Sequence, residues 1–202
     1  MNNSIYLDNA ATTYPKPESV YIAMDRFFRE LGANPGRSGH SMAVKAEEMI
    51  DNTRLAAAKF FNIGDHRRVV FTLNATDGLN MGIKGALKQG DHAITSHLEH
   101  NSVSRPLEGL SRAGVIEYDR ARNDADGFID PDDVRRLIRK NTRMIVITHV
   151  SNSFGAIQPV KEISEIARER GIIFFLDASQ SAGLVPLDIG GSCIDMFACP
   201  GH

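Results

Sequence analysis

The sequence predicts an α/β protein, a three-layer α/β/α domain with a mostly parallel sheet. From residue 67 onward, short apolar segments alternate with segments of helical periodicity. Several of the apolar segments are continuous runs without polar alternation, which is typical of strands that are covered by helices on both faces. No internal repeat or low-complexity segment interrupts this alternation. These observations favour a parallel sheet between two helical layers.

Two helices are predicted before the alternation begins. An extended segment over residues 1–15 precedes apolar residues at helical spacing, which predict a helix within residues 15–31 that ends at Gly32. A second, longer helix is predicted over residues 41–61 and ends near Asn62 and Gly64.

Six strands are predicted in the remaining chain, over residues 67–73, 91–96, 114–120, 142–150, 172–178 and 193–199. Helices are predicted over residues 76–88, 101–113, 130–140 and 160–171. Asp130 followed by Pro131 is a typical helix start, because proline is tolerated in the first turn.

Composition excludes several classes of protein. The 202 residues have a formal net charge of −2, which gives no electrostatic basis for binding nucleic acid or an anionic membrane. No run approaches the roughly 18 apolar residues of a membrane span, and the N-terminus has no signal-peptide pattern. Cys193 and Cys199, on one predicted strand, would lie roughly 20 Å apart and cannot form a disulfide with each other. A reducing, cytoplasmic location is expected.

Polar residues follow the predicted strands at the edge where open α/β sheets bind ligands. They are Ala75-Thr76, His100, Asn152, Asp177, Gln180 and His202. Thr76 is either a helix cap or part of a phosphate site at a helix N-terminus. His100 alone is a common surface-loop residue, and Asn152 alone is a common turn residue.

Asp177 is the most informative of these residues. It ends a run of apolar residues, so its carboxylate must be hydrogen-bonded or paired. The chain has no Walker A motif to accompany a Walker B aspartate, and no GxGxxG follows the first predicted strand. Pyridoxal 5′-phosphate (PLP) fits this set of groups: a phosphate-binding site, a flat histidine, an Asn/Gln pair and a buried acid. Its ring nitrogen needs a carboxylate.

Six segments carry a resemblance to a known family. They are YLDNAATT (6–13), FTLNATDGLN (71–80), LEHNS (98–102), THVSNSFGAIQPV (148–160), FLDASQSAG (175–183) and DMFACPGH (195–202). In this order and spacing they resemble the cysteine desulfurases, which are class V aminotransferases of the fold-type I PLP enzymes. The resemblance implies a partial PLP-binding large domain over residues 16–202, incomplete at the C-terminus, without the small C-terminal domain.

The resemblance also implies roles for the candidate residues. Ala75 and Thr76 would bind the PLP phosphate, with His202 beside it. His100 would stack on the pyridine ring and act as the catalytic residue that moves substrate protons. Asn152 and Gln180 would hydrogen-bond near the phenolic oxygen of PLP, and Asp177 would pair with the ring nitrogen. Residues 9–13 and the loop 34–40 would help to wall the substrate end.

Three departures from the family pattern bear on activity. The lysine that carries PLP follows the histidine in the family, so the resemblance implies a chain truncated one residue short of it. None of the lysines present takes that place: Lys16, Lys45, Lys59, Lys84, Lys88, Lys140 and Lys161. Pro200 stands where family members often have a phosphate-binding serine. The persulfide-forming cysteine is absent, because Cys193 and Cys199 are expected to be small buried residues.

The resemblance implies a homodimeric parent enzyme that converts L-cysteine to L-alanine and passes sulfur, by way of a persulfide, to an acceptor protein. The fragment itself is expected to be inactive, and no membrane or nucleic-acid partner is expected. A class V aminotransferase or lyase acting on another amino acid is an alternative. A non-catalytic binding or scaffold protein with the same fold is another.

Overall fold

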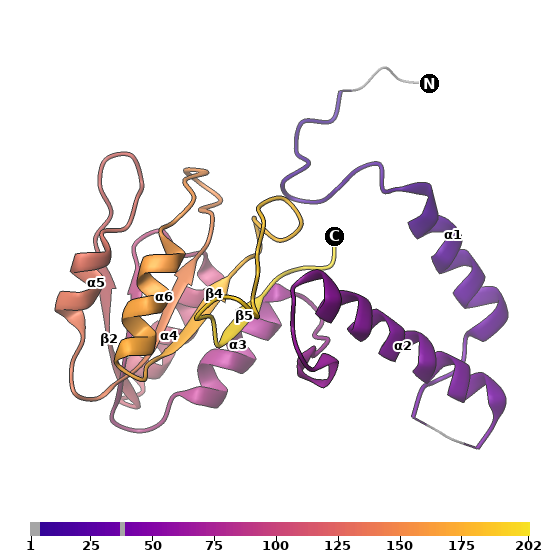
Figure 1. Ribbon diagram of the computed structural model, residues 1–202, viewed down its shortest axis with the longest axis horizontal. Helices are drawn as coiled ribbons and strands as arrows, with labels where there is room; N and C mark the ends of the chain where they lie inside the picture. Colours follow the sequence, from indigo (N-terminus) through magenta and orange to yellow (C-terminus); the bar gives the residue numbers. More distant parts are fainter. Residues whose placement is uncertain (1–4, 37–38) are drawn as a thin grey trace. The chain divides into compact units, whose positions relative to one another are not determined.

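The computed structural model describes residues 5–36 and 39–202. The chain forms two compact units, one reaching from the N-terminus to Val70 together with His202, and the other spanning Phe71–Gly201 (Figure 1). Within the described residues, no helix combines the length and apolar character needed to cross a membrane. Each unit is described separately.

The first unit is helical. It contains α1 (Glu18–Arg26), the π-helical turn η1 (Phe27–Leu31), α2 (Ser41–Phe60) and the short 3-10 helix η2 (His66–Arg68). Both helices expected from the periodicity are confirmed. The π-helical turn was not expected, and it is closed by the Gly32 N–H, which donates to the Phe27 carbonyl at 2.9 Å. Asn62 has a φ of 54°, a backbone conformation that continues no helix, and it follows the end of α2.

Few side chains of these helices are buried. None in α1 or η1 is buried, and only Ala43, Ala46 and Ala58 are buried in α2. Phe28 and Phe60 are among the exposed aromatic side chains of the unit. The apolar periodicity that predicts these helices is therefore not matched by a core of their own.

The second unit alternates strands with helices, as predicted. Its elements are α3 (Ala75–Ala86), β1 (Asp91–Ser96), α4 (Asn101–Arg112), β2 (Ile116–Ala121), α5 (Pro131–Leu137), β3 (Thr142–Thr148), α6 (Val160–Glu169), β4 (Ile173–Asp177) and β5 (Met196–Ala198). The start of α5 is as expected, because Asp130 Oδ1 accepts from the Asp132 N–H at 2.9 Å and Pro131 is in the first turn. After α6, Gly171 takes a positive φ of 64° that suits glycine.

The strands form one parallel sheet in the order β2-β1-β3-β4-β5. The predicted strand over residues 67–73 is wrong: η2 occupies its start, and the rest is irregular. Its side chains Val70, Phe71 and Leu73 are exposed, Leu73 to 92%. A strand requires a hydrogen-bonded neighbour, and in the described part of the chain no strand pairs with this segment.

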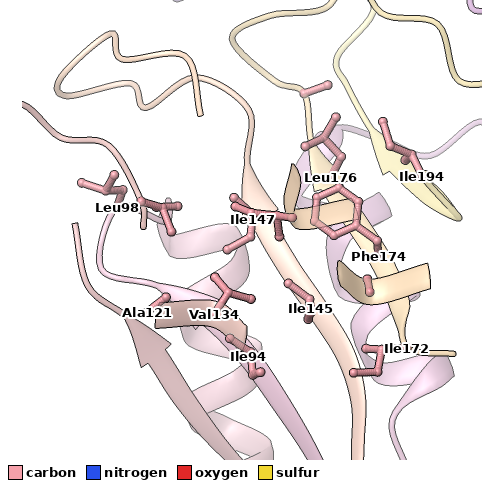
Figure 2. Close-up of a cluster of buried hydrophobic side chains, with 14 residues drawn as sticks. Ile94, Leu98, Ala121, Val134, Ile145, Ile147, Ile172, Phe174, Leu176 and Ile194 are labelled. Carbon is pink, nitrogen blue, oxygen red and sulfur yellow. The ribbon is translucent and has the colours of Figure 1, made fainter. Parts of the chain in front are cut away.

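Helices cover both faces of the sheet, so the expected three-layer architecture is confirmed. On one face, Ile94, Ile145, Phe174 and neighbouring apolar side chains pack against Val134 of α5 and against α6 (Figure 2). On the other face, an equivalent cluster packs against α3 and α4. Its buried members are Leu79, Ile83, Leu87, Ala93, Val103, Leu107, Ile116, Met144, Val146 and Phe175.

The strand order reverses between β1 and β3. From β1 the chain continues through α4 to β2, whereas from β3 it continues through α6 to β4, in the opposite direction along the sheet. The two crossover helices lie on opposite faces. Such a reversal opens a crevice beyond the carboxyl ends of the two strands, which is where ligands bind in open α/β folds.

Candidate active site

Asp177 is the buried acid of the carboxyl edge, as predicted. It is the last residue of β4, and it is only 3% exposed. Its Oδ1 accepts two hydrogen bonds, from the Ser179 N–H at 3.0 Å and from the Ser179 hydroxyl at 2.5 Å. No ion pair to Asp177 occurs among residues 5–36 and 39–202. The carboxylate is therefore held in place from one side, through one of its oxygens.

Thr76 lies where the starts of two helices meet. It is the second residue of α3, and its hydroxyl is 2.7 Å from the hydroxyl of Ser102, the second residue of α4. The N-cap of α3 is Asn74, whose Oδ1 accepts from the Asp77 N–H at 2.9 Å. The alternative that Thr76 serves only as a helix cap is thus wrong. Ala75 is the first residue of α3, as its predicted role requires.

His100 forms the N-cap of α4, a role that the sequence did not suggest. Its Nδ1 lies 3.2 Å from the Ser102 backbone N and 2.7 Å from the Ser102 hydroxyl oxygen. Since the backbone N–H can only donate, Nδ1 accepts, and the proton of the neutral ring is on Nε2. His100, Ser102 and Thr76 form a connected set of hydrogen bonds.

The other predicted site residues lie beyond the strand ends. Asn152 is exposed in the turn after β3, and Gln180 is half-buried in the turn after β4. His202 is exposed at the last position. Their roles toward a cofactor stay predictions. Arg37 and Ser38, within the predicted wall 34–40, lie outside the described residues.

Two residues of this edge were missed by sequence reasoning. Glu99 turns its carboxyl inward, and burial raises its pKa to about 8 despite hydrogen bonds from Ser96 and Thr148. His149, directly after β3, is 4% exposed, and its Nδ1 is 2.9 Å from the Ser181 hydroxyl oxygen. Burial lowers the pKa of His149. A signal for Glu99 was present, because this acid directly follows the apolar Leu98 near a strand end.

A groove lies between α3 and α4, beside the hydrogen-bonded residues Thr76, Ser102 and His100. Its volume is about 640 Å³, and its lining includes Thr76, His100, Lys84 and Arg105. The groove is thus lined by two cationic side chains as well as by Thr76 and Ser102, whose hydroxyls lie at helix N-termini, where anionic groups bind favourably.

The two cysteines do not lie on the strand that was predicted to hold them. β5 covers only Met196–Ala198, so Cys193 precedes it and Cys199 follows it. Both are free thiols and half-buried. Burial and the negative charge of Asp177 raise the pKa of Cys199, which keeps this thiol protonated and weakly nucleophilic.

The groups at the carboxyl edge of the sheet fit the chemical requirements of PLP. The ring nitrogen needs a carboxylate, which Asp177 offers with its Oδ2, because both of the hydrogen bonds described above fall on Oδ1. The phosphate needs hydroxyl and amide donors, which are present at the start of α3 and α4. A three-layer α/β domain with these groups at its carboxyl edge belongs to the class of phosphate-binding cofactor folds.

Comparison with known proteins identifies the family within this class. The profile of aminotransferase class V, a family of PLP-dependent enzymes, matches residues 5–202. The chain belongs to this family, and the resemblance seen in the sequence is confirmed.

The similar proteins are cysteine desulfurases by name. The chain is 37% identical over 211 residues to "Cysteine desulfurase IscS" of Shewanella sp. (strain MR-4), covering all of this chain and 51% of that protein. It is 34% identical to a "Probable cysteine desulfurase" of Methanothermobacter thermautotrophicus, covering 50% of that protein. The chain thus spans about half the length of the curated relatives that it matches.

Solved structures share the fold. An apo cysteine desulfurase from Thermococcus onnurineus NA1 superposes with a TM-score of 0.91 at 31% identity, covering 100% of this chain and 50% of that one. SspA in complex with cysteine gives a TM-score of 0.92 at 33% identity, covering 98% and 57%. These similarities confirm the predicted α/β fold class.

Proposed function

We propose that this chain is the PLP-binding part of a cysteine desulfurase, which converts L-cysteine to L-alanine and transfers the sulfur to an enzyme thiol as a persulfide. The observation that carries the proposal is the joint position of Asp177, His100 and the Thr76–Ser102 hydroxyl pair at the carboxyl edge of one sheet. Desulfurase relatives and a neighbour solved with cysteine support the choice of substrate.

Each residue has a defined task in this proposal. Thr76 and the first amides of α3 bind the phosphate, with Ser102 orienting the threonine hydroxyl. Asp177 holds a proton on the ring nitrogen. His100 covers the ring and moves substrate protons through Nε2, because Nδ1 is engaged by Ser102. Asn152 and Gln180 are assigned to the phenolic oxygen, and His202 to the phosphate.

PLP supplies an electron sink that stabilises negative charge on a substrate carbon. The chain maintains that capacity through Asp177, whose burial strengthens the interaction of its charge with a protonated nitrogen. Cys199 is not assigned as the sulfur nucleophile, since burial raises its thiol pKa. We assign the nucleophile and the PLP-bearing lysine to sequence beyond these 202 residues, in a protein that acts as a homodimer with a sulfur-acceptor partner.

The test uses the full reading frame that contains this chain. The purified protein is supplied with PLP and L-cysteine, and both alanine and sulfide released in the presence of a thiol reductant are measured. Equal amounts of the two products support the proposal. A protein that binds PLP but transfers an amino group from another amino acid would make it a class V aminotransferase. A reading frame that ends at His202, with no PLP binding, would favour a non-catalytic scaffold.

A further inference from the structure

Glu99 lies at the point where the strand order of the sheet reverses. It follows β1 by three residues, and its carboxyl reaches Thr148 at the end of β3, so its side chain connects the ends of these two strands. Its neighbour His100 caps α4 and is the proposed ring-stacking residue. No task in the proposed function uses Glu99.

One oxygen of Glu99 continues the connection between β1 and β3 beyond their last paired residues. The pairing of β1 with β3 reaches Ile94 and Ile145, and β1 ends at Ser96. Beyond that point, Glu99 Oε1 accepts from the Thr148 N–H at 3.0 Å and from the Ser96 hydroxyl at 2.6 Å. The side chain thus ties the end of β1 to the end of β3 beyond their paired residues.

The other oxygen of Glu99 is buried and has no hydrogen-bond partner within the described residues. An ionised carboxylate with a buried, unpaired oxygen is costly, whereas a carboxylic acid can place its proton there and keep Oε1 as the acceptor. No Lys or Arg side chain of the described part pairs with Glu99. The geometry therefore favours the neutral form.

The charges at the strand ends act in the same direction. Asp177 is the register partner of Thr148, the residue that Glu99 binds, and its negative charge opposes a second one on Glu99. His149, after β3, is buried, and its lowered pKa keeps it neutral at pH 7. His97 and His100 flank Glu99 on its own segment and are exposed.

We propose that Glu99 is a positioning residue that stands as a neutral carboxylic acid at pH 7, fixing His100 at the start of α4 and keeping Asp177 free of an ionised neighbour. This inference rests on the proposed function for the roles of His100 and Asp177. The state of the Glu99 carboxyl itself is a property of this chain alone.

The pH dependence of stability follows from that state. In the unfolded chain, a glutamate loses its proton near its usual pKa of about 4.3. In the folded chain, Glu99 keeps its proton until about pH 8. Folding is therefore penalised progressively as pH rises from about 4.3 to 8, and the folded-to-unfolded ratio falls by on the order of 1,000-fold or more through this group.

The first experiment follows the carboxyl carbon of Glu99 by NMR in the 202-residue chain without PLP. A midpoint near pH 8 is expected, and it should move down in D177N, because a negative charge has been removed. A midpoint near 4.5, or one that D177N leaves in place, would overturn the proposal. Glu162, exposed on α6, serves as the internal reference.

The second experiment compares E99Q with E99A. E99Q keeps an acceptor at Oε1 and carries no charge, so its melting temperature at pH 8 should exceed that of the wild type. E99A leaves the Thr148 N–H unpaired and should melt lower. E162Q is the control and should follow the wild-type pH profile. An E99Q protein that melts below the wild type at pH 8 would refute the neutral state.

The third experiment measures PLP affinity by titration of the protein encoded by the full reading frame. E99Q should bind PLP within about 3-fold of the wild type, and E99A should bind PLP more weakly by at least about 10-fold. When both variants are folded at the titration temperature, this difference reports positioning and not stability. Equal affinity for E99A would refute the positioning role. Absence of PLP binding in every protein would count against the proposed function, whereas the NMR midpoint still decides the state of Glu99.

Discussion

Residues 144–147 of β3 and residues 148–149, at and just beyond its end, follow one another directly in the chain, yet they are stabilised in different ways. The first four side chains, Met144 to Ile147, are apolar, fully buried and packed against helices on both faces. Thr148 and His149 are also buried, but they are held by hydrogen bonds to Val150, Ser181 and the backbone of neighbouring strands. The interior of the sheet gains its stability from burial of apolar area, whereas its carboxyl edge keeps polar groups that lower stability unless each is satisfied.

The contrast extends to the charged groups. The interior contains close-packed aliphatic and aromatic side chains, while the edge places Glu99 and Asp177 near each other with no cation beside them in the described ranges. Sites where burial shifts the pKa of a carboxyl group, as it does for Glu99, are typical of functional regions.

The largest effect is expected in the interior. Phe174 is fully buried between β4 and the α5–α6 layer, so Phe174→Ala should reduce the free energy of unfolding by about 3–5 kcal/mol. Urea denaturation at pH 7 measures this. Leu184→Ala is the control, because Leu184 is 77% exposed and its loss should cost less than about 0.5 kcal/mol. Equal losses in the two variants would mean that the core is not packed as described.

At the edge, the same comparison predicts a large effect on activity and a small one on stability. Asp177→Asn keeps an oxygen that can accept from Ser179 but removes the charge. Release of alanine from L-cysteine by the full-length protein should fall by on the order of 100-fold or more, without loss of unfolding free energy. Asp126→Asn, in an exposed turn, should leave both unchanged. Unchanged kcat/KM in Asp177→Asn would contradict the role of Asp177.

A smaller effect is expected where a helix approaches the sheet. Gly82 of α3 faces the Phe175 ring and the Met196 methyl group so closely that an added Cβ would overlap both. Gly82→Ala should therefore reduce the free energy of unfolding by about 1–3 kcal/mol. Gly85→Ala, in the same helix with open space around it, should instead raise it by about 0.5–1 kcal/mol. Thermal melts of the pair test the packing, and two effects of the same sign would contradict it.

The smallest effect concerns a polar group within the interior. His92 of β1 is fully buried, with Nδ1 2.8 Å from the Thr142 hydroxyl oxygen, and burial, assisted by the charge of Arg139, lowers its pKa. The unfolded state gains a proton below about pH 6.5 while the folded state resists it, so stability should fall as pH decreases, by up to about 1.4 kcal/mol per pH unit. This sign is opposite to that expected for Glu99.

His92→Gln should flatten the acidic part of the stability profile, measured by urea denaturation between pH 5 and 7. His97→Gln, a change of the exposed histidine directly after β1, should leave the acidic part of the profile unchanged. A profile that keeps its slope in His92→Gln would assign the acid sensitivity to another group, such as the buried His149.

Local chemistry made the helices and most of the strands predictable. The apolar runs of β3 and β4, and the Asp130–Pro131 start of α5, are recognisable because burial and helix capping leave regular patterns in sequence. The prediction of a strand over residues 67–73 was wrong for a reason that no local sequence pattern reveals. Its β-type residues need a neighbouring strand, and strand pairing depends on residues far away in sequence.

The candidate site divides in the same way. The sequence by itself determined that Asp177 is a buried acid that must be hydrogen-bonded, because an acid that ends an apolar strand has few alternatives. Only the tertiary structure decided that Thr76 meets Ser102, that His100 caps α4, and that the Glu99 carboxyl reaches Thr148. These contacts join segments 26 and 49 residues apart or depend on where a strand ends. The order of the strands in the sheet sets them, and that order results from the packing of the whole chain.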